Sequence, residues 1–112
     1  MSQITTHILD TTYGKPAKDV KINLYQIVNN VWIEIASGIT NSDGRITNLL
    51  SNDKKLEIGI YKMKFFTKEY FENKNVTTFY PFIEIVFELN SAEHYHIPLM
   101  LNPFGYSTYR VS

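Results

Sequence analysis

The sequence predicts an all-β domain, a sandwich of about seven or eight strands with one short helix. The first observation is a period of two, because apolar and polar side chains alternate in several separate segments. The second is that turn-forming residues separate these segments. The third is that a single segment, residues 67–75, is compatible with a helix, while no internal repeat or low-complexity tract appears.

The first predicted strand covers residues 4–9. Alternation gives it two faces, with Ile4, Thr6 and Ile8 on one and Thr5, His7 and Leu9 on the other. We expect the isoleucine face to be buried, which leaves His7 directed away from the core.

The next two predicted strands form a hairpin. Residues 19–28 and 31–36 both alternate, and Asn29-Asn30 separates them. Asparagine tolerates the positive φ of tight hairpin turns, so these two residues predict a two-residue loop.

The middle of the chain adds a turn, two strands and the helix. Asn41-Ser-Asp-Gly44 is a turn by composition, and Arg45 follows where a strand begins. Residues 58–66 and 82–89 are predicted strands rich in branched and aromatic residues. Thr67 is the expected N-cap of the helix between them.

Two further strands end the chain. In residues 94–101, His94 and His96 share a face with Pro98, and the opposite face is apolar. Pro98 cannot donate a ladder hydrogen bond, so this strand should have a free side or an irregularity. In residues 106–112, Arg110 and Ser112 should point the same way.

Length and composition limit the class of protein. The 112 residues fit one domain, residues 1–112, and no cysteine is present for disulfides or thiolate metal sites. Eleven basic and eleven acidic residues balance, without the basic cluster that nucleic-acid binding requires. Neither a signal peptide nor a membrane-spanning stretch is visible, so we expect a cytoplasmic protein without membrane or nucleic-acid partners.

Three histidines and an arginine are the candidate functional groups. Taken singly, a histidine in a small β-domain is usually a surface or hydrogen-bonding residue, and an arginine after a turn is usually solvated. A sharper alternative is a zinc site, because a His-x-His pair with a distant third histidine resembles a three-histidine ligand set. That site would use His7, His94 and His96.

Three blocks of sequence carry a family resemblance over the whole chain. The first is THILDTT at residues 6–12 followed by GKPA at 14–17, the second is Asp43-Gly44-Arg45, and the third is HYHIPL at 94–99 followed by PFGYSTYR at 103–110. These blocks resemble the 5-hydroxyisourate hydrolases, the enzymatic branch of the transthyretin-like family.

The resemblance implies a fold, an assembly and a reaction. The fold would be a sandwich of two four-stranded antiparallel sheets with one short helix. The assembly would be a homotetramer, a dimer of dimers, with active sites in clefts at subunit interfaces. The reaction would be hydrolysis of 5-hydroxyisourate, the product of urate oxidation, to 2-oxo-4-hydroxy-4-carboxy-5-ureidoimidazoline, without a cofactor or metal.

The resemblance also implies site residues. The catalytic residues of the family map onto His7, Arg45 and His96, and its substrate-binding residues map onto Tyr109, Arg110 and Ser112. Neutral imidazole suits the activation of water, so His96 or His7 would take the water proton. A permanently charged guanidinium would stabilise the anion at Arg45. We expect His94 to support its neighbour structurally.

One residue departs from the family pattern, which ends Tyr-Arg-Gly-Ser where this chain ends Tyr-Arg-Val-Ser. If the glycine is needed for positive φ, Val111 is poorly tolerated. If the segment is extended, valine is well suited and alternation aims it away from Arg110 and Ser112.

The alternative from another class is a non-catalytic protein that binds a small ligand, as transthyretin does with hydrophobic hormones. This chain keeps the three catalytic positions and most of the C-terminal motif, which favours the enzymes.

Overall fold

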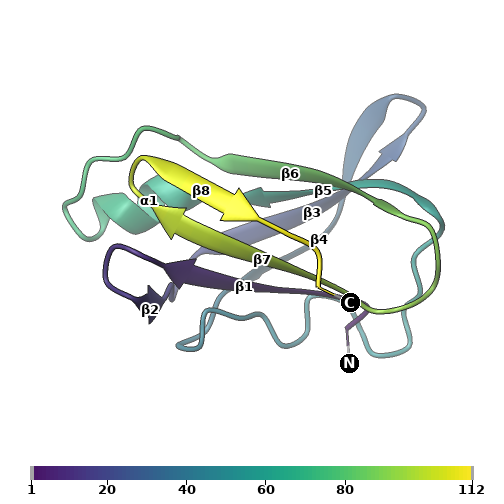
Figure 1. The fold of residues 1–112 in the computed structure, drawn as a ribbon. Helices are drawn as coiled ribbons and strands as arrows, with labels where there is room; N and C mark the ends of the chain where they lie inside the picture. The colour runs from purple at the N-terminus through teal and green to yellow at the C-terminus, as the bar shows by residue number, and fades with distance from the viewer. Residues whose placement is uncertain (1, 112) are drawn as a thin grey trace.

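The structure, a computed structural model, describes residues 2–111. Over that range the chain forms eight strands and one helix (Figure 1). In chain order they are β1 (Ile4–Asp10), β2 (Lys15–Pro16), β3 (Lys21–Val28), β4 (Val31–Ile39), β5 (Gly59–Phe65), α1 (Thr67–Glu72), β6 (Ile83–Leu89), β7 (Tyr95–Asn102) and β8 (Gly105–Thr108).

The strands form two four-stranded sheets that pack face to face (Figure 1). One sheet has the order β2-β1-β7-β8 and the other has the order β4-β3-β5-β6. Helix α1 lies at one end of the sandwich. The predicted sandwich of two four-stranded sheets with one short helix is confirmed.

One strand pair differs from the antiparallel sheets that the resemblance implies. Strands β1 and β7 run parallel, with Ile4 opposite Tyr95 and Asp10 opposite Leu101, so their sheet is mixed. Parallel neighbours need a long crossover connection, and here the whole second sheet lies between them in the sequence. Segments from opposite ends of the chain therefore meet at the centre of one sheet.

Alternation along β1 and β7 separates the core from the outer face as predicted. In β1 every second residue from Ile4 to Asp10 is buried, and the residues between them are half-buried. His96 is likewise half-buried between the buried Tyr95 and Ile97. The outer face of this sheet thus carries the polar side chains that the sequence singled out.

The hairpin between β3 and β4 is also confirmed. Asn29 and Asn30 both take positive φ, at 52° and 63°, and Val28 pairs with Val31 across the loop. Two consecutive positive φ values are what a tight hairpin that matches the strand twist requires.

Helix α1 is shorter than predicted and begins differently. It ends at Glu72 instead of Asn75, which has a φ of 57° and ends the turns that follow. Phe66, not Thr67, is the N-cap, because the Phe66 amide still donates to the carbonyl of Lys21 and continues the strand pairing. Within residues 2–111 no helix has the length and apolar character to cross a membrane.

A buried hydrogen bond fastens α1 to β1. The Tyr70 hydroxyl donates to Oδ2 of the fully buried Asp10 at 2.7 Å, and the Thr12 amide donates to Oδ1 at 2.9 Å. Burial, together with the neighbouring Asp10 carboxylate, raises the pKa of Tyr70 well above its usual range. The tyrosine therefore stays protonated and remains a donor.

Replacing Tyr70 by phenylalanine should lower the free energy of unfolding by about 1.5–3 kcal/mol, because a buried carboxylate loses a donor. Urea denaturation at pH 7 measures this loss. Tyr13→Phe is the matched control, since Tyr13 is 50% exposed and should change stability by less than about 0.5 kcal/mol. Equal stability of the two variants would contradict the role given to this bond.

Candidate active site

The parallel pairing of β1 with β7 aligns polar side chains on the outer face of the mixed sheet. Thr5 lies opposite His96, and His7 lies opposite Pro98 two residues further along. Thr5, His7 and His96 are all half-buried. This pairing brings together two segments that are 91 residues apart in the sequence.

The turn before Arg45 docks on the other edge of β1. The side chain of Asn41 closes the turn by accepting hydrogen bonds from the amides of Asp43, at 2.9 Å, and Arg45, at 3.2 Å. The backbone of Arg45 then forms an antiparallel bridge with His7. Residues opposite each other in such a bridge project to the same face, so Arg45 joins the outer face of the sheet.

Gly44 makes this docking possible. Its φ is +74°, and a Cβ there would lie 2.5 Å from the backbone oxygen of Ile8. The Ile8 amide donates to the Gly44 carbonyl at 2.9 Å, which holds the two segments at this close distance. A side chain at position 44 would push the Arg45 segment away from β1.

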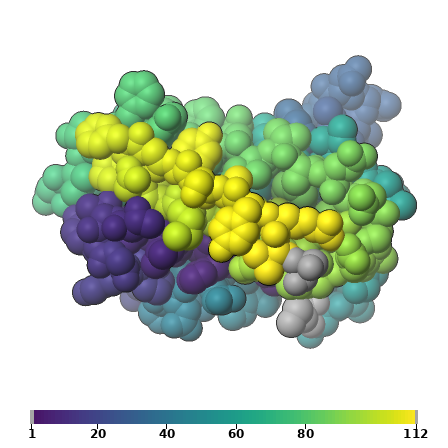
Figure 2. All heavy atoms as spheres, viewed as in Figure 1, coloured from purple at the N-terminus to yellow at the C-terminus, as the bar shows by residue number. Residues whose placement is uncertain are grey.

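The C-terminal segment docks on β7 in the same way. His96 and Val111 exchange two backbone hydrogen bonds, of 3.0 and 3.1 Å. This bridge keeps the register of the β7–β8 ladder, in which Leu99 lies opposite Thr108. The interruption falls at Pro98, which lacks the N–H that a continuous ladder would need. The irregularity predicted at Pro98 is thus confirmed, and Figure 2 shows the terminal segment in yellow across this face.

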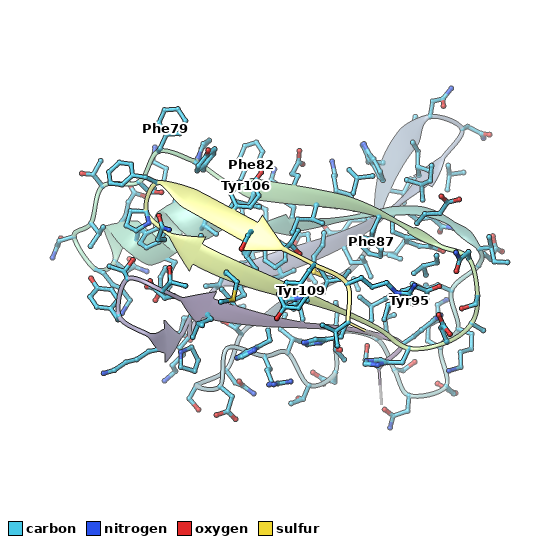
Figure 3. The ribbon with its side chains drawn as sticks, viewed as in Figure 1. Phe79, Phe82, Phe87, Tyr95, Tyr106 and Tyr109 are labelled. Atoms are coloured by element: carbon cyan, nitrogen blue, oxygen red, sulfur yellow. The ribbon has the colours of Figure 1, made fainter. Side chains whose placement is uncertain are left out.

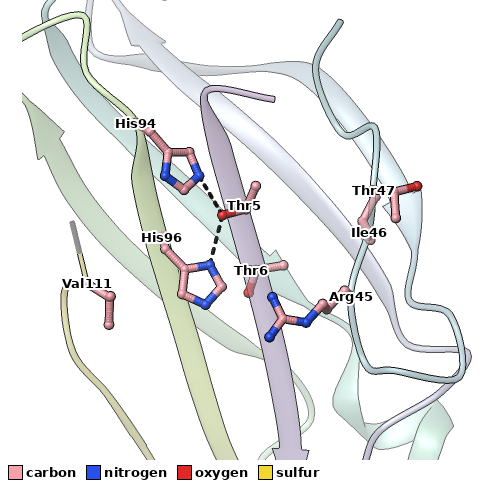
Figure 4. Close-up of a pocket in the computed structure, with 8 residues that line it drawn as sticks. All are labelled: Thr5, Thr6, Arg45, Ile46, Thr47, His94, His96 and Val111. Carbon is pink, nitrogen blue, oxygen red and sulfur yellow. Dashed lines mark hydrogen bonds between the residues drawn. The ribbon is translucent and has the colours of Figure 1, made fainter. Parts of the chain in front are cut away.

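These segments enclose a cleft of about 580 Å³, which is within the size range of small-molecule sites. Its wall residues include Thr5, Arg45, Thr47, His94, His96 and Val111 (Figure 4). His7 is outside this lining, although its backbone pairs with Arg45 at the edge of the cleft.

Thr5 is a site residue that sequence reasoning did not single out. Its hydroxyl lies 2.8 Å from Nε2 of His94 and 2.8 Å from Nδ1 of His96 (Figure 4). Alternation already placed Thr5 on the face of His7, but only the register with β7 shows which side chains it contacts.

Both histidines of the site favour their neutral forms. Burial, followed by the charge of Arg45, lowers the pKa of His7, although nearby Asp43 opposes the shift. Burial, then the charges of Arg45, His7 and His94, lowers the pKa of His96. Neutral imidazole is the form that accepts a proton, so the cleft holds a base beside a permanent cation.

The structure does not bring Arg110 into this cleft. Its guanidinium pairs with Glu93 and lies 4.6 Å from the centre of the Tyr95 ring. Arg110 and Tyr109 line a second cleft, whose lining also includes Tyr95 of β7 and Phe87 of β6, labelled in Figure 3. The prediction that Arg110 and Val111 point to different sides is confirmed. Ser112, the other predicted binding residue of the terminus, lies outside the described residues.

Val111 occupies the side of the terminus that we expected for Arg110. It lines the histidine cleft and pairs with His96 in an extended conformation. Val111 does not have a positive φ, because the non-glycine residues with positive φ in the described chain are Asp19, Asn29, Asn30 and Asn75. Valine therefore fits the backbone, as the extended alternative required, but it does not point away from the site.

The zinc alternative is not supported by the geometry. Within the described part of the chain, no three His, Cys, Asp or Glu side chains lie close enough together to hold a metal ion. His94 and His96 each direct a ring nitrogen at the Thr5 hydroxyl instead.

The fold and its outer-face cleft define a transthyretin-like β-sandwich, and comparisons with known proteins agree. A 5-hydroxyisourate hydrolase of Salmonella dublin is 44% identical over 110 residues, which cover 97% of this chain and 80% of that protein. Sea bream transthyretin in complex with thyroxine has a TM-score of 0.91 and 34% identity, covering 98% of this chain and 95% of that one.

The 5-hydroxyisourate hydrolase of Klebsiella pneumoniae has a TM-score of 0.86 and 30% identity, covering 97% of this chain and 98% of that one. The HIUase/Transthyretin family, as a sequence profile, matches residues 4–111. This chain belongs to that family.

Gly44→Ala should lower the free energy of unfolding by at least about 2 kcal/mol, since alanine is strained at this φ and also meets the Ile8 oxygen. Gly14→Ala is the matched control, because Gly14 has a φ of +66° but nothing within 4 Å of its Cβ position. The control should lose only about 1 kcal/mol. Chemical denaturation measures both, and equal losses would contradict the close approach of Gly44 to β1.

Proposed function

We propose that this protein hydrolyses 5-hydroxyisourate to 2-oxo-4-hydroxy-4-carboxy-5-ureidoimidazoline. The observation that carries the proposal is the cleft that holds the imidazole of His96 and the guanidinium of Arg45. Similarity over nearly the whole chain to proteins named 5-hydroxyisourate hydrolase supports the choice of substrate.

In the proposed mechanism His96 is the general base. Between the two candidate bases, His96 lines the cleft and His7 does not. Its lowered pKa keeps the ring neutral near pH 7, so it can take a proton from water as the oxygen attacks the ring carbonyl. His7 stays beside Arg45 as an assisting group.

Arg45 stabilises the anion that forms during attack. The guanidinium keeps its charge at every relevant pH and presents several donors in a fixed plane. Collapse of the tetrahedral intermediate breaks the ring C–N bond, and the His96 imidazolium returns its proton to the leaving nitrogen. This sequence requires only the water, the substrate and the two side chains.

We further propose that the protein acts as a homotetramer, with its sites at subunit interfaces. Strands β6 and β8 each form one of the two edges of their sheet, and a free strand edge favours pairing with another chain. Exposed apolar side chains lie on both, including Val86 and Tyr106. Within one chain, Tyr109 and Arg110 line a different cleft from His96. We therefore expect them to take up their predicted binding role only in the assembled tetramer.

The competing function is non-catalytic binding of a small ligand. It is favoured by the close structural match to a transthyretin crystallised with thyroxine. The assay below separates the two functions, because a binding protein leaves the spontaneous decay of 5-hydroxyisourate unchanged.

The direct test generates 5-hydroxyisourate with urate oxidase and follows its absorbance decay with and without the protein. The proposal predicts acceleration, and His96→Asn should reduce the enzymatic rate by about 100-fold or more because the base is lost. Arg45→Ala should lose about 100- to 1,000-fold through the missing donor. His7→Asn should lose less than His96→Asn. No acceleration by the folded wild-type protein would overturn the proposal.

The pH dependence of the rate gives a second prediction. Since His96 must be neutral and its pKa is lowered in the free protein, the acidic limb of the kcat/KM profile should have its midpoint below 6.5. Activity therefore persists as the pH falls through 6.5 and is lost only below it. In Arg45→Met, the midpoint of the acidic limb of the residual activity should shift to higher pH, because a cation that opposes protonation of His96 is gone. A wild-type midpoint above 6.5 would contradict the assignment of the base.

A further inference from the structure

The hydroxyl of Thr5 contacts two imidazoles at once. Its oxygen lies 2.8 Å from Nδ1 of His96 and 2.8 Å from Nε2 of His94. No other hydrogen bond of this hydroxyl occurs within residues 2–111. A hydroxyl has one proton and two lone pairs, so Thr5 can donate to one ring at most. Because its proton has no other acceptor among these residues, Thr5 satisfies that proton by donating to one ring and accepting from the other.

Two hydrogen-bond arrangements satisfy this constraint when both rings are neutral. In the first, Nδ1–H of His96 donates to Thr5, and Thr5 donates to Nε2 of His94. In the second, Nε2–H of His94 donates to Thr5, and Thr5 donates to Nδ1 of His96. The hydroxyl therefore couples the tautomers of the two rings.

Only the first arrangement leaves His96 active as a base. It places the proton on Nδ1, so that Nε2 has a free lone pair, and Figure 4 shows this nitrogen on the side of the ring toward Arg45. In the second arrangement Nε2 is protonated and cannot accept a proton from water.

The charges around His96 favour moving a proton away from it. Arg45 comes from the turn on the far edge of β1, His7 from β1 itself, and His94 from the residue before Tyr95; these are the charged or titratable groups that act on His96. His94 lies on the side of His96 opposite Arg45 (Figure 4). A positive charge on His94 is thus farther from the guanidinium than the same charge on His96.

We propose that Thr5 links His96 and His94 in a proton relay, and that Thr5 is a positioning residue of the hydrolytic reaction. When Nε2 of His96 takes the water proton, the Nδ1 proton of His96 passes to the Thr5 oxygen. The hydroxyl proton of Thr5 passes to Nε2 of His94, which becomes the imidazolium.

The relay conserves the number of protons and returns to its starting state within one turnover. After the forward step His96 is neutral with its proton on Nε2, Thr5 is again a hydroxyl, and His94 carries the charge. Reversal returns a proton to Nδ1 of His96 as Nε2–H protonates the leaving nitrogen. This inference rests on the proposed function, since it assigns roles within the same reaction, and it gives His94 more than the structural role expected from the sequence.

The first experiment compares Thr5→Val, Thr5→Ser and Thr11→Val in the 5-hydroxyisourate assay. Valine keeps the shape of threonine without the hydroxyl, so Thr5→Val should lower kcat by about tenfold with little change in KM. Thr5→Ser should restore most of the rate. Thr11→Val is the matched control, because its hydroxyl joins β1 to β7 at the other end, donating to Leu101 at 3.1 Å.

Two readouts separate a relay from a merely structural bond. Long-range ¹H–¹⁵N spectra of the wild type near pH 7.5 should show His96 with its proton on Nδ1, and Thr5→Val should lose this preference while His7 is unchanged. In addition, Thr5→Val combined with His94→Gln should be no slower than the slower single variant, because both changes break the same relay.

The outcomes distinguish this inference from the proposed function. An active wild type with an equally active Thr5→Val variant and an unchanged His96 tautomer would overturn the relay alone. Additive losses in the double variant would also overturn it. A folded wild type without any activity would overturn the proposed function, and with it the catalytic role of the relay.

Discussion

The parallel pairing of β1 with β7 is the constraint on which the rest of the site depends. It sets Thr5 opposite His96 and leaves one free edge on each strand at the same end of the sheet. The Arg45 turn occupies the edge of β1, and Val111 occupies the edge of β7. Segments from the beginning, the middle and the end of the chain thus lie side by side, and a shift of the register by one residue would send His96 to the core face.

The C-terminal segment shows how this sheet tolerates a change at a family position. Val111 extends the β7–β8 register past the gap at Pro98, in a conformation that suits a β-branched residue. Its side chain forms an apolar part of the cleft wall beside His96. Arg110, on the other side, forms an exposed ion pair with Glu93 and lies over the ring of Tyr95. Within one chain, the terminus therefore contributes its backbone and Val111 to the wall of the histidine cleft, while Arg110 lines the other cleft.

Most of the fold was predictable because strand alternation is a local property. The outward placement of His7 and His96, the Asn29-Asn30 hairpin and the irregularity at Pro98 all follow from side-chain order or backbone chemistry. The parallel pairing was not predictable in the same way, since it depends on how the chain crosses between sheets. Without that register, the hydrogen bonds between Thr5 and the two histidines could not be predicted. Alternation showed that Arg110 and Val111 point to different sides, but not which of the two faces the histidines.

We propose that the substrate binds in the outer-face cleft of the mixed sheet, and not in the second cleft. The most direct measurement is a titration of the ¹⁵N-labelled protein with a stable bicyclic analogue of urate, followed by amide chemical shifts. We expect saturable shifts at Thr5, Arg45, His96 and Val111, which surround the first cleft. Shifts confined to Tyr95, Ile97 and Arg110, which line the second cleft, would contradict it.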